Sequence, residues 1–139
     1  MQTAKSLLQA YIDGSARESA LLFAEHGALE LPYLADLGVE PRYEGPDDIG
    51  HFLGFLHDTM YPGFTFTDVQ IYIDTPEQAF GEYTIHHRSG ISGKTVHQRF
   101  FGHCVTKNGK IVLLREALNV LAAADAMFPG GAADVLSKK

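Results

Sequence analysis

Residues 95–119 read TVHQRFFGHCVTKNGKIVLLREALN, and this stretch decides the fold. Asn108 and Gly109 lie between two apolar runs. Asn-Gly in that setting is the strongest short-range signal for a hairpin, because a type I′ turn needs positive φ at both central residues. A two-residue loop then pairs Phe101 with Glu116. The stretch therefore predicts two long antiparallel strands whose register can be read from the turn.

One face of this predicted hairpin is polar. Side chains alternate between the two faces of a strand. The pairing therefore puts five residues on one face: His97, Arg99, Phe101, His103 and Glu116. Two of them carry a formal charge, and the two histidines acquire one on protonation. A polar cluster of this kind is either solvated surface or the lining of a pocket.

Length and composition describe a globular protein. The chain has 139 residues, of which 45% are hydrophobic, so we expect one domain over residues 1–139 with its own core. The formal charge is −6, and the scattered Lys and Arg residues argue against a nucleic-acid partner. Cys104 is the only cysteine, which excludes an internal disulfide. The start of the chain lacks a signal-peptide pattern, so we expect a cytoplasmic protein. No apolar run approaches the ~20 residues that span a bilayer.

Three helices are predicted in the first half of the chain. Residues 3–13 carry the apolar stripe of an amphipathic helix. Ser15 begins a capping box, which predicts a second helix over residues 16–23. The sequence Gly-Pro-Asp-Asp at 45–48 begins a third helix, because proline suits the first turn and acidic side chains complement the positive end of the helix dipole. Pro62-Gly63 ends it.

Outside these helices, the hydrophobic pattern has the period of 2 that is typical of strands. We expect five strands, at residues 28–33, 64–74, 78–89, 95–106 and 110–118. If 90–93 forms a loop, Glu82 faces Phe101 and His86 faces His97. Helices followed by a strand meander predict an α+β domain, with the helices on one face of a curved antiparallel sheet.

The order of these elements and three short motifs resemble the NTF2-like superfamily. The motifs are LFAEHGA at 22–28, NGKI at 108–111 and REALNV at 115–120. The chain is similar to the SnoaL-like and ketosteroid-isomerase-like branch, and its last motif resembles that of the phenazine-biosynthesis A/B proteins. The resemblance implies an NTF2-like cone, in which about three N-terminal helices pack on the concave face of a curved antiparallel sheet.

The resemblance also implies a function. It implies general acid/base chemistry of the isomerase, cyclase or dehydratase type, on a hydrophobic or aromatic small molecule in a conical pocket. No cofactor is implied, and homodimers would pack through the convex face. Glu116 falls on the glutamate that is the pocket acid/base of the phenazine proteins. Their helix histidine falls on Phe52, one residue beyond His51, so the chain departs from the pattern there.

Glu116, Arg99 and Glu82 are the catalytic candidates. Glu116 interrupts an apolar row, where a carboxylate is paired, hydrated or functional. Desolvation in an apolar cone would raise its pKa towards the pH at which proton transfer is efficient. Arg99 is either an ion-pair partner of Glu116 or a group that binds a substrate carboxylate or an enolate oxygen. Glu82 is a second acid/base, a partner of Arg99 or a solvated residue.

Seven residues are candidates for substrate binding: His51, Phe52, Phe55, His86, His97, Phe101 and Tyr33. The aromatic residues are either plain core or the walls of a pocket for a flat ring. His86 and His97, together with Glu82, have the ligand types of a zinc or iron site. We expect no metal, because ordinary hydrogen bonding accounts for a histidine pair in a polar cleft.

Two other functions stay open. The cone can serve as the receptor of a non-catalytic small-molecule binding protein, or its own side chains can fill it in a dimerisation module, and fold alone does not separate these from an enzyme. A homodimer is expected because the face opposite Glu116 would be apolar and uncovered. That face is predicted to carry Val96, Phe100, Cys104, Ile111 and Leu113.

Overall fold

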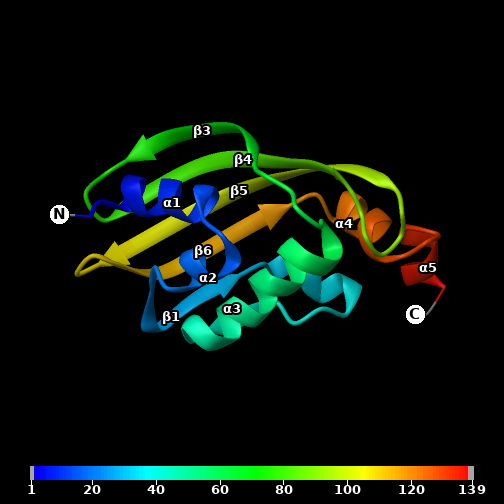
Figure 1. Cartoon of the computed structure of the whole chain (residues 1–139), viewed down its shortest axis with the longest axis horizontal. Helices are drawn as coiled ribbons and strands as arrows, with labels where there is room; N and C mark the ends of the chain where they lie inside the picture. Colours follow the sequence, from blue (N-terminus) through cyan, green and yellow to red (C-terminus); the bar gives the residue numbers. More distant parts are fainter. Residues whose placement is uncertain (1, 138–139) are drawn as a thin grey trace.

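The computed structural model describes residues 2–137. Six strands form one curved sheet in the order β2-β1-β6-β5-β4-β3 (Figure 1). The strands are β1 (Phe23–Glu30), β2 (Arg42–Glu44), β3 (Thr67–Asp74), β4 (Gln78–Arg88), β5 (Thr95–Lys107) and β6 (Lys110–Leu118). Neighbouring strands are antiparallel, except that β1 and β6 run parallel. The predicted α+β class is confirmed, and the parallel pair is the departure from it.

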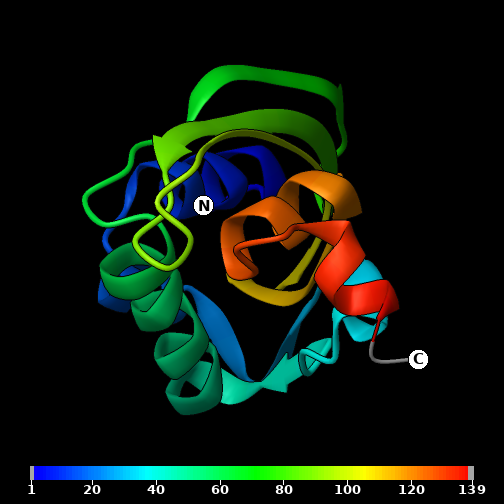
Figure 2. The same cartoon turned by 90° about the vertical axis from the view of Figure 1, so that its right-hand side faces the viewer.

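Helices cover one face and one end of this sheet. They are α1 (Ala4–Asp13), α2 (Ala16–Ala20), the 3₁₀ helix η1 (Pro32–Leu37), α3 (Gly45–Phe55), the π-helical turn η2 (Leu56–Met60), α4 (Val120–Met127) and α5 (Ala132–Leu136). Figure 1 shows α1, α2 and α3 on the same side of the sheet. Figure 2 shows α4 within the end of the curved sheet, with α5 beside it. We call the side covered by α1 to α3 the inner face and the opposite side the outer face.

The first two helices begin as predicted, and the second ends early. Thr3 and Ser15 each form a capping box with the residue three positions later, which satisfies otherwise free backbone N–H groups. The predicted second helix runs to residue 23, whereas α2 ends at Ala20. The chain turns into β1 there because the Leu22 carbonyl accepts a hydrogen bond from the N–H of Ile111, at 3.0 Å. Pairing with β6 therefore replaces helical hydrogen bonding.

The hairpin turn between β5 and β6 forms as predicted, but the register then shifts. Asn108 and Gly109 both have positive φ, 53° and 76°, as a type I′ turn requires. The pairs next to the turn follow the predicted register. A β-bulge then makes Val105 pair with Leu113, which leaves Val112 as an extra residue in β6. Beyond the bulge every pairing is displaced by one residue.

This displacement moves Glu116 to the inner face. Glu116 pairs with Gly102 instead of Phe101 and is buried, whereas Arg99 and Phe101 are exposed. The prediction that Glu116 and Arg99 share a face is therefore wrong. The prediction for β4 and β5 is confirmed, since Glu82 faces Phe101.

The inner face forms the core together with the helices. Helix α1 packs on β4 and β5, and α3 packs on β1. Four of the five residues expected on an uncovered apolar face are instead buried here: Val96, Phe100, Cys104 and Ile111. That expectation is wrong, because the chain's own helices cover these side chains. Within residues 2–137, no helix is both long and apolar enough to cross a membrane.

Candidate functional site

A buried glutamate and tyrosine form a hydrogen-bonded pair on the inner face. Glu116 follows Leu114 and precedes Leu118 on this face of β6, and it is 2% exposed. The Tyr83 hydroxyl, on β4, donates a hydrogen bond to Glu116 Oε2. Tyr83 itself is fully buried. The pair therefore places one ionisable carboxyl in an apolar environment.

Burial sets the ionisation of this pair. It raises the pKa of Glu116 from 4.5 to about 7, although the hydrogen bond from Tyr83 acts in the opposite direction. Burial also raises the pKa of Tyr83, and the charge of Glu116 adds to that shift. Tyr11, on α1, is affected in the same way. Glu116 is therefore a carboxyl group that changes its charge near neutral pH.

One oxygen of the carboxyl group is free. Among residues 2–137, Oε2 of Glu116 accepts the Tyr83 hydrogen bond, and no described group donates to Oε1. No enclosed side-chain oxygen of these residues lacks a hydrogen-bond partner, so Oε1 retains a small accessible surface. This oxygen can accept or release a proton.

Gly102 makes room for the pair. It lies on β5, between the strands that carry Tyr83 and Glu116. A Cβ atom at Gly102 would lie 2.3 Å from the Tyr83 hydroxyl oxygen and 3.1 Å from the adjacent ring carbon. A real Cβ atom essentially never lies within 3.0 Å of another non-bonded heavy atom. The tyrosine therefore crosses β5 only because residue 102 has no side chain.

We expect Gly102→Ala to separate the pair and destabilise the protein. Overpacking a rigid core costs about 1–3 kcal/mol, and here the clash falls on a fully buried ring. Urea unfolding measures the loss. Adding Tyr83→Phe should recover part of it, because the closest clashing atom is then absent.

Gly54→Ala is the matched control. Gly54 lies in α3, and no atom lies within 4 Å of a Cβ built there. Alanine favours a helix over glycine by about 1 kcal/mol, so this variant should be more stable than the wild type. A Gly102→Ala protein with unchanged stability would show that Tyr83 does not need the space above Gly102.

A small apolar cavity lies between α3, η2 and α4. Its volume is about 30 Å³. It is lined by Leu31, Leu34, Val39, Phe52, Phe55, Leu56, Met60, Tyr61, Gln98, Phe100, Leu118, Ala123 and Met127. Phe100 connects it to the buried pair, because its ring also stacks on Tyr83 with 5.8 Å between centroids. Phe100 thus borders both the cavity and the Tyr83 ring.

Helix α4 closes the end of the cone and is held at both ends. The Gln98 side chain donates to the Asn119 carbonyl and accepts from the Asn119 N–H, both at 2.8 Å. Asn119 caps α4. At the other end, the Ser89 hydroxyl donates to the Ala126 carbonyl at 2.5 Å. Gln98 therefore serves both as a cavity wall and as the anchor of α4.

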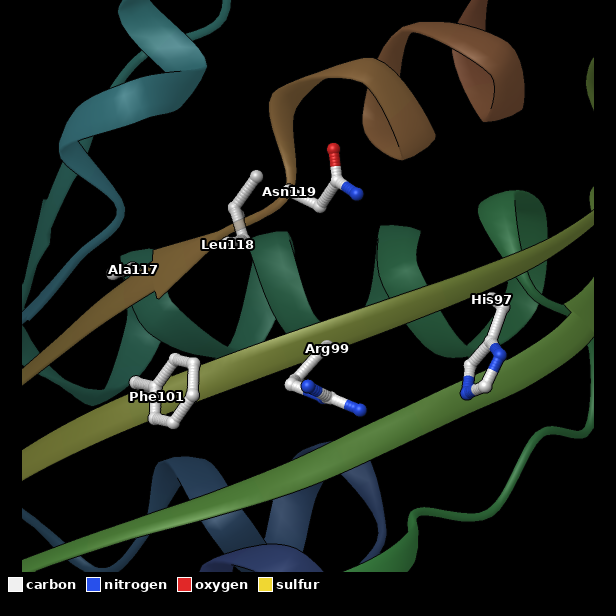
Figure 3. A pocket seen from close by; sticks show the side chains of 6 residues that line it. All are labelled: His97, Arg99, Phe101, Ala117, Leu118 and Asn119. Atoms are coloured by element: carbon white, nitrogen blue, oxygen red, sulfur yellow. The ribbon is translucent and has the colours of Figure 1, made fainter.

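The other polar residues predicted for the site lie on the outer face. His97, Arg99 and Phe101 line an open depression of about 420 Å³, together with Ala117, Leu118 and Asn119 (Figure 3). The side chains of His97 and Arg99 point away from the helices in this view. This volume exceeds that of the inner cavity because the depression is open to solvent. Glu116 does not line it.

Arg99 pairs with Glu82 and not with Glu116. The distance between Arg99 Nε and Glu82 Oε2 is 3.4 Å, and the Tyr72 hydroxyl donates to the other oxygen of Glu82. Three roles were possible for Glu82 from the sequence, and the structure shows one of them, the ion-pair partner of Arg99. Both catalytic candidates other than Glu116 are therefore on the far side of the sheet from the buried pair.

The predicted histidines do not reach the inner cavity either. His86 and His97 stack with 5.1 Å between ring centroids, and both are exposed on the outer face. His51 is exposed in a surface groove beside Arg17. Their predicted place in the pocket is wrong. Within residues 2–137, no group of three or more His, Cys, Asp or Glu side chains is arranged to hold a metal ion.

Two of the predicted aromatic residues do line the cavity. Phe52 and Phe55 form part of its wall on α3, whereas Tyr33 is 52% exposed on η1 and Phe101 is 37% exposed on the outer face. Four residues of the site were missed by sequence reasoning: Tyr11, Tyr83, Gln98 and Phe100. Tyr83 and Phe100 belong to the apolar alternation of β4 and β5, which marks the inner face, and Tyr11 belongs to the apolar stripe of α1.

Comparison with known proteins identifies relatives that share this fold. An uncharacterised PhzA/B-like protein of Pseudomonas aeruginosa is 33% identical over 119 residues, which cover 83% of this chain and 80% of the relative. No family model matches the sequence.

Solved structures superpose over most of the chain. A phenazine biosynthesis-related protein of P. aeruginosa matches with a TM-score of 0.74 at 19% identity, over 89% of this chain and 84% of its own. A Bacillus subtilis protein provisionally assigned as an isomerase matches with a TM-score of 0.74 at 21% identity, over 88% and 91%. A SnoaL-like protein of Jannaschia sp. CCS1, provisionally assigned as a polyketide cyclase, gives 0.71 at 13% identity, over 89% and 90%. The predicted NTF2-like, SnoaL-like fold is confirmed.

Proposed function

This chain belongs to the PhzA/B-like family, and we propose that it is a small-molecule enzyme that carries out general acid/base chemistry in the conical pocket. The reaction is of the isomerase, cyclase or dehydratase type, on a hydrophobic or aromatic substrate. Glu116 transfers the proton. Arg99 and Glu82 have no part in this proposal, because they lie on the outer face.

The proposal rests on the free oxygen, Oε1, of the buried Glu116 carboxyl group. Oε2 of Glu116 is held by Tyr83, which fixes the carboxyl group, and Oε1 is left for the substrate. Burial raises the pKa of Glu116 to about 7. A general acid/base is most efficient when its pKa lies near the working pH, so this carboxyl group is suited to take a proton from carbon and to return it.

The proposed step is a proton transfer at a carbon atom next to a carbonyl group. The ionised Glu116 removes that proton, and the electron pair of the C–H bond moves into the carbonyl group to give an enolate. The protonated Glu116 then returns the proton at another carbon. Phe100 lines the cavity and stacks on Tyr83, so movement of its ring would bring the substrate closer to Oε1.

A non-catalytic binding protein is the second candidate, and one observation favours it. Glu116 is absent from the lining of the cavity, so a ligand can occupy that space without touching the carboxyl group. The volume of about 30 Å³ also fits the third reading, a dimerisation module whose own side chains fill the cone.

Deuterium incorporation from D₂O distinguishes an enzyme from the other two candidates. We expect the protein to exchange the methyl protons of acetophenone, an aromatic ketone, faster than buffer alone, and Glu116→Gln to remove the acceleration. Mass spectrometry measures the exchange. Exchange at the buffer rate, with acetophenone bound, would support the binding protein instead.

We also propose that the protein forms a homodimer through the outer face. That face exposes Tyr72 and Ile73, each 57% exposed, and Phe101, whose ring stacks on Phe80 with 6.1 Å between centroids. Exposed aromatic and aliphatic side chains of this kind are typical of protein interfaces. Like residues would meet across a twofold axis.

Phe101→Glu should therefore convert a dimer into a monomer. It places a charge where the apolar core of the interface would lie, next to Glu82, and burying an unpaired charge is unfavourable. Light scattering measures the mass in solution. Leu121→Glu is the control, since Leu121 is exposed on α4 and not on the strands that carry Tyr72, Ile73 and Phe101. A wild-type monomer at micromolar concentration would contradict the dimer.

A further inference from the structure

The lining of the outer depression contains one formally charged side chain, and that side chain is a cation. His97, Arg99 and Phe101 lie two residues apart on β5, so their side chains form one row on the same face of the strand. Figure 3 shows Arg99 between the two rings. The other lining residues are uncharged: Ala117, Leu118 and Asn119. The depression therefore presents a guanidinium group beside flat rings and a mostly apolar floor.

Part of this guanidinium group is free to bind a ligand. The Nε atom of Arg99 lies 3.4 Å from Glu82 Oε2. Within the described part of the chain, residues 2–137, no hydrogen bond joins its two terminal amino groups to another residue. These groups carry four of the five N–H donors of a guanidinium, and their planar arrangement matches the two oxygens of a carboxylate. Arg99 can therefore keep its ion pair with Glu82 and bind a second carboxylate.

Asn119 supplies a second hydrogen-bond donor to the depression. Its side-chain oxygen accepts from the N–H groups of Leu121 and Ala122 at the start of α4, at 3.0 and 3.3 Å. Figure 3 shows this oxygen turned towards α4. The NH₂ group of the same amide has no partner among residues 2–137 and is a donor only. An anion in the depression can accept from it.

Two pairs of stacked rings lie on either side of Arg99. Phe101 stacks on Phe80 with 6.1 Å between centroids and 11° between the ring planes. His97 stacks on His86 with 5.1 Å between centroids. Each pair joins β4 to β5, which holds its rings in place, and Phe101 remains exposed. A flat aromatic molecule can pack against Phe101 while an acidic group on it reaches Arg99.

We propose that the outer depression is a binding site for an aromatic carboxylate. The terminal amino groups of Arg99 bind the carboxylate, and Phe101 contacts the ring. The depression has a volume of about 420 Å³, which is within the range of small-molecule sites. Its chemistry differs from that of the inner cavity, which has no charged residue in its lining. The inference does not depend on the reaction proposed for Glu116, which lies on the other face of the sheet.

A second copy of the chain is the competing occupant. The depression borders the surface proposed for the dimer, and Phe101 belongs to both. Tyr72, Ile73 and Phe80, however, line no part of the depression. We therefore place the ligand beside the dimer surface.

Benzoate is the probe, with benzamide and acetate as controls. Benzamide keeps the ring without the charge, and acetate keeps the carboxylate without the ring. NMR titration of the whole protein, at constant pH and ionic strength, measures the three affinities. We expect benzoate to bind with a Kd on the order of 1 mM, as suits a small ligand in an open site. Each control should bind about threefold more weakly or worse.

Arg99→Ala should weaken benzoate binding about three- to tenfold, the range for a charge-assisted hydrogen bond in contact with solvent. Benzamide binding should stay within about twofold. The fold should be kept, because an exposed ion pair contributes little to stability. Glu82→Gln should strengthen benzoate binding about two- to fivefold, since it removes the anion next to the guanidinium. Loss of structure cannot produce such a gain.

Arg88→Ala is the matched control. Arg88 is an exposed arginine of β4 that lines a different depression, so its removal should leave benzoate binding within about twofold. Equal weakening in Arg88→Ala and Arg99→Ala would reduce the effect to net charge and overturn the inference. Nuclear Overhauser effects from benzoate to the Phe101 ring would support it. Effects to the methyl groups of Met60 and Met127 alone would place benzoate in the inner cavity and overturn it.

Absence of benzoate binding by the wild type, well above the expected Kd, would also overturn the inference. If light scattering then shows a dimer, the partner covers the depression. Glu116→Gln should bind benzoate as the wild type does. A wild type that binds benzoate through Arg99 but exchanges no deuterium would keep this inference and refute the proposed enzyme.

Discussion

Glu116→Gln should lower the rate of turnover by about 10²- to 10⁴-fold and leave ligand affinity within about tenfold. Glutamine has nearly the same shape as glutamate, and its oxygen can still accept the hydrogen bond from Tyr83. It cannot accept and return a proton. Only interactions of the transition state are lost, so the change should appear in kcat. Steady-state kinetics on a substrate and calorimetric binding measure the two quantities.

Arg99→Ala is the matched control. Arg99 is 59% exposed and pairs with Glu82 on the outer face, so its removal should leave both the rate and its pH dependence unchanged. A rate that falls as much in Arg99→Ala as in Glu116→Gln would place the chemistry in the outer depression. An unchanged rate in Glu116→Gln, with the fold intact by circular dichroism, would make Glu116 a structural residue.

The stability of the wild type should fall by about 3 kcal/mol relative to Glu116→Gln as pH rises from about 4 to about 8. The pKa of Glu116 is about 7 in the folded protein, against 4.5 ordinarily. Between these values the folded protein holds a proton that the unfolded chain releases. Its stabilising effect is complete below about pH 4.5 and lost above about pH 7.

Urea unfolding at several pH values measures this difference. Other carboxyl groups act in the opposite direction: Arg115 and Arg42 lower the pKa of Glu30, for example, so that its contribution is lost as pH falls. These groups are common to both proteins, and the comparison removes them. A difference between wild type and Glu116→Gln that stays constant from pH 4 to pH 8 would contradict the raised pKa.

Much of the fold follows from the sequence because its signals are local. The capping box at Ser15 and the positive φ at Asn108-Gly109 depend on a few neighbouring residues. The β4–β5 register, which follows once residues 90–93 are assumed to form the loop, is also confirmed. Boundaries failed where pairing between distant segments decided them, as at Leu22, whose carbonyl is bound by β6.

The predicted position of Glu116 is wrong because of one β-bulge in β6. Four consecutive apolar residues, Ile111 to Leu114, hide the alternation where the bulge occurs. The alternation in the rest of the two strands argues against an uninterrupted register. Glu116 lies in an apolar row of β6, whereas Arg99 lies in a polar row of β5. An uninterrupted register would put these two rows on the same face of the sheet. One extra residue in β6 puts them on opposite faces.

The remaining errors have similar causes. His51 lies next to the buried stripe that contains Ile49 and Phe52, but its own position on the helix falls outside that stripe, on the exposed side of α3. Sequence reasoning does not reach Tyr83, because it predicts that the polar face of the hairpin lines the pocket, whereas the apolar face is the inner one.

The pKa of Glu116 tests the central claim most directly. The ¹³C chemical shift of its carboxyl group, followed by NMR against pH, reports the ionisation of this one residue. We expect a transition near pH 7 and a higher midpoint in Tyr83→Phe, because the hydrogen bond from Tyr83 lowers the pKa of Glu116. A midpoint near the ordinary 4.5 in the wild type would show that Glu116 is solvated and ionised throughout, and would contradict its role as the proton carrier.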